Sequence, residues 1–276
     1  MKRTILAGLG ALALACGGGT DNSISYGSPQ PSTAQEQAAA GGAQTTLAAT
    51  AAYQASPEPT VGAPGLADQL AADLGAYAGM TAPTDPLRTL AAPTLGRSPG
   101  TALFVPMDPA CVVQDATSVT WTDCTTSNTD DITGDTMTLV VNGSLTWNPV
   151  TGVTSWDVVQ SLDASMTMDA GVLTIHATAH PVGSITVTGT TIVGHAASTV
   201  SETASYLGQT VSATVVTTLD LDLGYQAEPF CITSGTLELE QVWTRRPAGY
   251  SEAELPNQGW RFEWSGCGLF TVAHGS

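Results

Sequence analysis

Apolar and polar residues alternate along most of the chain from residue 101 to the C-terminus. The period of two is clear in residues 136–147, in residues 210–223 and again in residues 260–272. In the first of these runs the residues of the apolar face are Met137, Leu139, Val141, Leu145 and Trp147. Turn signals such as Asn148-Pro149 separate the runs. This pattern is typical of antiparallel strands that bury one face against a core.

The length of these runs favours one kind of β architecture. Residues 136–147 already make 12 alternating positions, about twice the usual strand length. Long strands that follow one another through short turns predict a mainly β fold, a long-stranded antiparallel meander forming a curved sheet, half-barrel or barrel. We expect this β domain to span residues 101–276.

A different period precedes the β domain. Leu66, Leu70, Leu74 and Tyr77 recur at spacings of three and four, which predicts an amphipathic helix over residues 65–80. Its apolar stripe is expected to pack against the sheet, and residues 81–100 form a Pro-rich linker. A helix laid in the concave face of a curved sheet is similar in architecture to the periplasmic carriers of bacterial lipoproteins, although no motif supports that similarity.

The segment before this helix has a composition typical of disorder. Residues 16–64 are rich in Gly, Ser, Thr, Ala, Gln and Pro, contain no Lys or Arg, and have few large apolar side chains. Such a chain buries too little surface to offset its conformational entropy. The sequence therefore predicts a disordered stalk over residues 16–64.

The N-terminus carries the features of an export signal. Lys2 and Arg3 precede an apolar run at residues 5–15, which is shorter than the 20 or so residues of a membrane span. The run ends in Leu12-Ala13-Leu14-Ala15-Cys16, which resembles the lipobox of bacterial lipoproteins. The resemblance implies removal of residues 1–15 and acylation of Cys16 with palmitate and related chains. Gly17 after the cysteine implies an outer-membrane destination. An ordinary secretory signal with an incidental cysteine is the alternative.

Charge narrows the set of partners. The chain of 276 residues has 24 Asp and Glu against 7 Lys and Arg, and a net charge of −17. Removal of the signal would take away Lys2 and Arg3 and leave the chain more acidic still. Nucleic acid is excluded as a partner, because binding to phosphates needs clustered basic residues. We expect a membrane contact through the N-terminal lipid, with an envelope protein or an apolar ligand as a further partner.

Four cysteines remain besides Cys16, namely Cys111, Cys124, Cys231 and Cys267. An even number in an exported chain predicts two disulfides. We favour Cys111–Cys124 and Cys231–Cys267, because each pair brackets a local strand–turn–strand segment. A zinc site is the competing use of four cysteines, but the chain has no CxxC motif.

Candidate chemistry is sparse, and no catalytic motif or cofactor site is predicted. The loop with Asp130, Asp131 and Asp135 is a weak calcium candidate, and an acidic hairpin loop without metal is the favoured interpretation. His176 and His180 are about 13 Å apart on a strand and are expected to face solvent. Three tryptophans are candidates for lining a ligand cavity, namely Trp243, Trp260 and Trp264. Core packing is the favoured interpretation for all three.

These observations predict a lipid-anchored protein of the cell envelope with a non-enzymatic binding or structural role. The alternative is a carrier or sensor of an apolar ligand held between the curved sheet and the helix. A third hypothesis is an envelope hydrolase that uses carboxylates on the polar strand faces, of which the candidates are Asp220, Asp222, Glu238 and Glu240.

Overall fold

One long-stranded antiparallel sheet forms the β domain. The computed structural model describes residues 24–53, 66–67, 109–129, 133–168 and 171–276. Within them the sheet has eleven strands in the order β1-β11-β10-β9-β8-β7-β6-β5-β4-β3-β2. The strands are β1 (Gln30–Pro31), β2 (Val112–Gln114), β3 (Ser118–Thr129), β4 (Thr136–Asn148), β5 (Val153–Met168), β6 (Gly171–Thr188), β7 (Thr191–Tyr206), β8 (Gln209–Ala227), β9 (Phe230–Arg245), β10 (Gln258–Gly266) and β11 (Leu269–Gly275).

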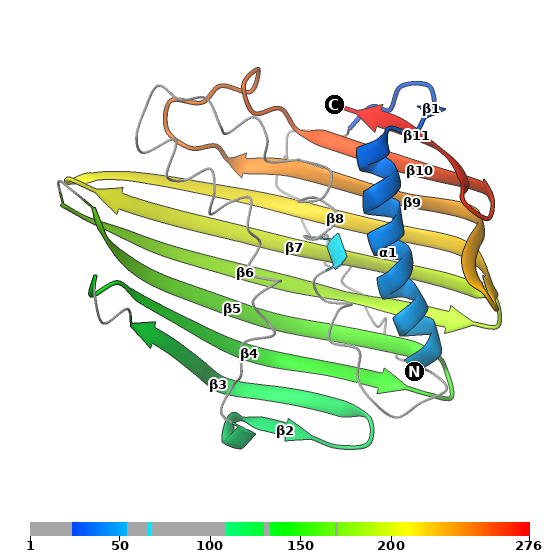
Figure 1. Ribbon diagram of the computed structural model, residues 1–276, viewed down its shortest axis with the longest axis horizontal. Helices are drawn as coiled ribbons and strands as arrows, with labels where there is room; N and C mark the ends of the chain where they lie inside the picture. The colour runs from blue at the N-terminus through cyan, green and yellow to red at the C-terminus, as the bar shows by residue number, and fades with distance from the viewer. Residues whose placement is uncertain (1–23, 54–65, 68–108, 130–132, 169–170) are drawn as a thin grey trace, which may run out of the picture.

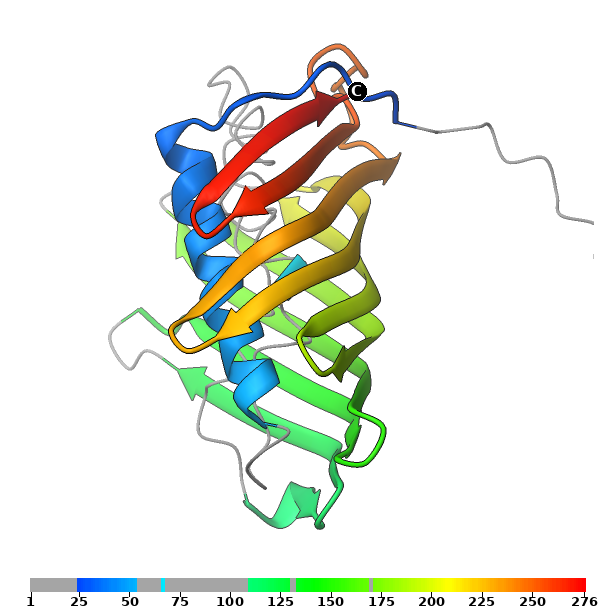
Figure 2. The same ribbon diagram turned by 90° about the vertical axis from the view of Figure 1, so that its right-hand side faces the viewer.

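The sheet is curved and does not close on itself. From β2 to β11 each strand pairs with the next strand of the sequence, which confirms the predicted meander. The 20-residue helix α1 (Ala34–Tyr53) crosses one face of the sheet (Figure 1). Figure 2 shows that this face is the concave one. We call it the covered face and the opposite side the outer face.

The alternation seen in the sequence places residues on these two faces. In β8, Leu219, Leu221 and Leu223 are buried on the covered face, whereas Asp220 and Asp222 between them are exposed on the outer face. The strands pair in register, so that most apolar positions lie beside apolar positions of the neighbouring strands; Leu219, for example, pairs with Ala196 and Leu239. Burial of this continuous apolar face is the main favourable contribution to folding.

Helix α1 corrects the predicted disordered stalk, because residues 24–53 are ordered. The helix starts with a capping box: the Thr33 hydroxyl accepts a hydrogen bond from the Glu36 backbone, and the Glu36 carboxylate accepts one from the Thr33 backbone at 2.6 Å. Ala39, Ala43 and Leu47 are buried against the sheet. Alanine favours the helix and loses no side-chain entropy when buried, so an Ala-rich segment can fold with few large apolar residues.

The residues before α1 wrap around the edge of the sheet. On the outer face, the Arg261 guanidinium lies 4.2 Å from the ring centre of Tyr26, and the Tyr26 hydroxyl donates to Glu240. The chain then pairs with β11 through β1 and the Tyr26–Gly275 bridge, and turns into α1 on the covered face. We call residues 24–36 the N-terminal clip, because they contact both faces.

A short helical piece is all that the structure describes of the predicted helix 65–80. Leu66 and Ala67 are helical and belong to the main core. They lie over the covered face beside α1 (Figure 1). The rest of that helix, the linker 81–100, the signal 1–15 and Cys16 lie outside the described residues.

The clip supplies a pH-dependent contribution to stability. Burial acts to raise the pKa of Glu36, but hydrogen bonds from Thr33 and His274 outweigh it and hold the pKa below its ordinary value of 4.5. The ionised carboxylate therefore stabilises the fold above about pH 4.5, and this contribution is lost as the pH falls through the lowered value. We expect Glu36→Gln to cost about 1 kcal/mol at pH 7 and much less at pH 3.

Urea unfolding of wild type and Glu36→Gln at both pH values measures this effect. The same comparison in a His274→Asn background shows how much of the Glu36 contribution to stability depends on the histidine. An unchanged difference between the two proteins at pH 7 and pH 3 would contradict the prediction.

Candidate functional site

The tryptophans gather on the covered face. All six of the chain are buried, between 3% and 8% exposed, and all belong to the main core cluster with α1. They are Trp121, Trp147, Trp156, Trp243, Trp260 and Trp264. The three predicted candidates are thus core residues. Trp264 packs against Phe262 and Phe270, with ring centres 5.8 and 5.3 Å away.

Polar side chains are also buried on the covered face. Gln160 on β5, Thr217 on β8 and Gln241 on β9 are each 0% exposed. Thr217 and Gln241 lie directly opposite each other in the sheet. In the structure as described, neither amide, nor the Thr217 hydroxyl, nor the Trp156 indole N–H has a hydrogen-bond partner. We call these four residues the buried polar patch.

The buried polar patch lowers the stability of the fold. The sequence analysis did not predict it. A buried polar group without a partner costs about 1–3 kcal/mol. The sequence does contain a signal for the patch, because its polar residues occupy positions of the strand pattern where apolar residues are expected. Gln241, for example, stands between Leu239 and Trp243 on the apolar side of β9. A polar residue at an apolar position of a regular strand would have pointed to the patch.

The outer face carries the strand carboxylates. A shallow groove of about 480 Å³ is lined by Asp220, Asp222 and Glu238, together with His195. Arg261 Nε donates to Glu238 at 2.8 Å. Burial, opposed by the Tyr26 hydrogen bond and assisted by nearby carboxylates, raises the pKa of Glu240. The clip engages Glu240 through Tyr26, so this carboxyl serves to hold the clip on the sheet.

Histidines on the outer face pair with aspartates. His176 bonds to Asp163 and His180 to Asp157, both at 2.8 Å, and the two histidine side chains are 56% and 48% exposed. The expectation that both face solvent is confirmed. Within the described residues no group of three His, Cys, Asp or Glu side chains is placed to hold a metal ion.

The calcium candidate is only partly described. Asp130 and Asp131 lie outside the described residues. Asp135 accepts a hydrogen bond from the Thr167 backbone at 2.6 Å, and its own backbone N–H donates to the Thr133 hydroxyl. Its carboxylate therefore ties the β3–β4 loop to the end of β5, which is a structural role.

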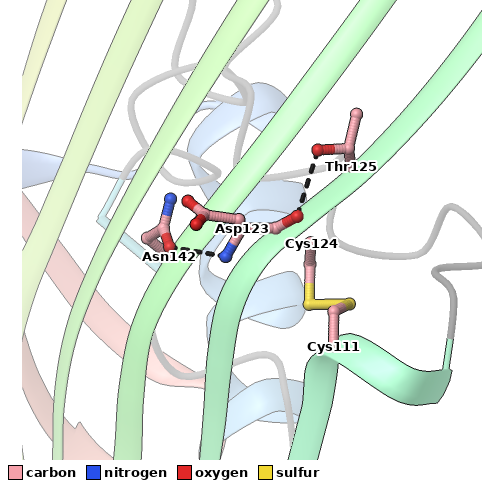
Figure 3. Close-up of a disulfide and its surroundings, with 5 residues drawn as sticks. All are labelled: Cys111, Asp123, Cys124, Thr125 and Asn142. Carbon is pink, nitrogen blue, oxygen red and sulfur yellow. Dashed lines mark hydrogen bonds between the residues drawn. A yellow bond between two sulfur atoms is a disulfide. The ribbon is translucent and has the colours of Figure 1, made fainter.

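Both predicted disulfides are present. Cys111–Cys124 joins the 3-10 turn (Pro109–Cys111) before β2 to the middle of β3 (Figure 3). Strand β3 has a bulge there: Asp123 adopts a positive φ of 50°, and its backbone N–H donates to Asn142 at 2.7 Å. Cys231–Cys267 joins the start of β9 to the turn between β10 and β11.

Comparison with known proteins does not assign the chain to a family. No family model matches it, and no curated protein and no solved structure matches it either. Among the described residues, no helix has both the length and the apolar character needed to cross a membrane.

Proposed function

We propose that the chain is an exported, lipid-anchored protein of the cell envelope whose β domain is a non-enzymatic binding module. The lipobox-like sequence ending at Cys16 supports the anchor. The two disulfides support an oxidising compartment, because such bonds persist outside the cytosol. The outer membrane is the destination that Gly17 favours.

The buried polar patch is the observation that carries the binding role. A sheet that served only as a scaffold would be more stable with apolar residues at Gln160, Thr217 and Gln241, because their polar atoms lose water and gain no partner. Residues that lower stability are typical of functional sites. Their position on the same face as the buried tryptophans supports the covered face as the binding surface.

The clip sets how far the domain stands from the membrane. The first residue that the structure describes is Ile24, and residues 17–23 lie between it and Cys16 in the sequence. Even fully extended, this segment spans no more than about 30 Å. The anchor would therefore hold the β11 edge close to the lipid surface, where a ligand could pass between the membrane and the covered face.

Cys16→Ser is expected to move the protein from the membrane fraction to the soluble fraction and to abolish labelling with radioactive palmitate. Several acyl chains on one residue anchor firmly, whereas the acidic chain has little attraction for anionic lipid. The matched control is the double variant Cys111→Ser, Cys124→Ser, which removes two other cysteines and should stay in the membrane. Membrane retention of Cys16→Ser would contradict the anchor.

The binding role has its own test. Native mass spectrometry of the wild-type protein, extracted in a sugar-free detergent, should show a co-purifying small molecule. A protein that carries no added mass under these conditions would favour a purely structural role.

A further inference from the structure

The buried polar patch has a defined arrangement on the covered face. Thr217 and Gln241 are neighbours on β8 and β9, and Gln160 lies on β5, three strands from β8. At about 4.8 Å per strand, β5 and β8 are roughly 14 Å apart along the sheet, and its concave curvature brings their side-chain ends closer.

Strands β6 and β7 separate the two sides of the patch. In the register of the sheet, Ala179 and Val200 continue the row of Gln160, whereas Pro181 and Ser198 continue the row of Thr217. The two sides of the patch therefore lie in neighbouring rows of the covered face, offset by two residues along the strands.

The patch is uncharged and offers both donors and acceptors. Each glutamine amide has two N–H donors and one carbonyl acceptor, the threonine hydroxyl does both, and the Trp156 indole donates. Among the buried residues that the structure describes there is no Lys or Arg, and the buried acids Glu36 and Glu202 disfavour an anion. A ligand that satisfies the patch therefore carries no negative charge and has closely spaced hydroxyl groups.

Aromatic side chains complete the recognition surface. Trp243 is two residues from Gln241 on the same face of β9, and Trp156 supplies a second ring from β5. A flat apolar ring beside hydrogen-bonding groups suits the C–H face of a sugar ring and its hydroxyl rim.

We propose that the covered face binds an uncharged, polyhydroxylated group, either a saccharide or the sugar headgroup of a glycolipid, between Gln160 on one side and Thr217 and Gln241 on the other. This inference rests on the proposed binding role and names the chemistry of its ligand. The adjoining apolar face accommodates an acyl chain where the source is a glycolipid.

Three probes test whether the protein recognises a sugar and whether that sugar is free or part of a glycolipid. Titrations follow tryptophan fluorescence of the full chain carrying Cys16→Ser, with dodecyl maltoside below its critical micelle concentration, maltose, and dodecyl phosphocholine. Dodecyl maltoside is expected to bind saturably and at least about tenfold more tightly than dodecyl phosphocholine, which has the same chain without a sugar. Maltose binding identifies a free saccharide as sufficient, whereas binding of dodecyl maltoside alone identifies a glycolipid headgroup.

Two variants link binding to the patch. Gln241→Leu and Thr217→Val are each expected to weaken dodecyl maltoside binding about tenfold, while urea unfolding without ligand shows equal or greater stability, because an unpartnered polar group has been removed. Gln209→Leu at the exposed start of β8 and Thr218→Val on the outer face are the matched controls and should leave binding unchanged.

The outcomes distinguish this inference from the proposed function. Equal binding of dodecyl phosphocholine, unchanged affinity in both patch variants, or a co-purifying peptide would overturn the sugar inference and leave the binding role intact. If no probe binds and the native protein carries no added mass, both fail. A tenfold loss in the patch variants with preserved stability supports both.

Discussion

Replacing Cys231 and Cys267 together by alanine is expected to lower the free energy of unfolding by about 4 kcal/mol, and replacing Cys111 and Cys124 by about 3 kcal/mol. The bonds close loops with sequence separations of 36 and 13 residues, and a longer loop gains more entropy in the unfolded chain when it is released. The measurement is urea unfolding of the two double variants at pH 7.

The larger effect also has a structural component. Cys231–Cys267 ties the β10–β11 turn to β9, next to the aromatic cluster of Phe262, Trp264 and Phe270. Unfolding of the wild type in reducing buffer provides the control, because it opens both bonds without changing a residue. The prediction is wrong if the Cys231–Cys267 variant is no less stable than the Cys111–Cys124 variant.

Leu47→Ala is expected to lower the free energy of unfolding by about 3 kcal/mol. Leu47 is 0% exposed and, among the α1 side chains that the structure describes, is the large apolar one that is buried with the alanines. Truncation removes its buried methyl groups and leaves a cavity between helix and sheet, which the rigid strands cannot fully close. Urea unfolding monitored by tryptophan fluorescence measures the loss, since all six tryptophans lie in the same core.

A matched substitution on the other side of α1 tests whether the effect comes from packing. Thr45→Ala lies on the exposed side of the same helix and should change stability by less than about 0.5 kcal/mol. Limited proteolysis adds a second readout: residues 34–53 should be protected in wild type and cleaved faster in Leu47→Ala. If Leu47→Ala behaved like Thr45→Ala, α1 would not be docked on the sheet.

The β architecture could be predicted because its signals are local. Alternation with a period of two assigned residues such as Leu219 and Asp220 to opposite faces, and turn residues marked the ends of the strands. Each disulfide joins segments that are close in the sequence, so a pairing based on proximity was correct. Long strands in sequence order also led directly to the meander.

Helix α1 was missed because its stability comes from contacts far along the chain. The Gln44 side chain donates to the Phe230 carbonyl, and Glu36 bonds to His274, 238 residues away. A composition of Ala, Gly, Thr and Gln indicates disorder when the segment is considered alone. One local signal was available, because Thr33-x-x-Glu36 is a capping box that marks the start of a helix.

The sequence by itself determined which residues share a strand face and where the chain turns, since these depend on neighbours a few residues apart. It also favoured the correct cysteine pairs, because each pair brackets a local strand–turn–strand segment. Only the tertiary structure decided that the sheet stays open, which face is covered and that the segment covering it is α1. It also decided that Gln160, Thr217 and Gln241 are buried without partners. The physical reason is that burial and hydrogen-bond satisfaction depend on what packs against a face, and here those groups come from distant parts of the chain.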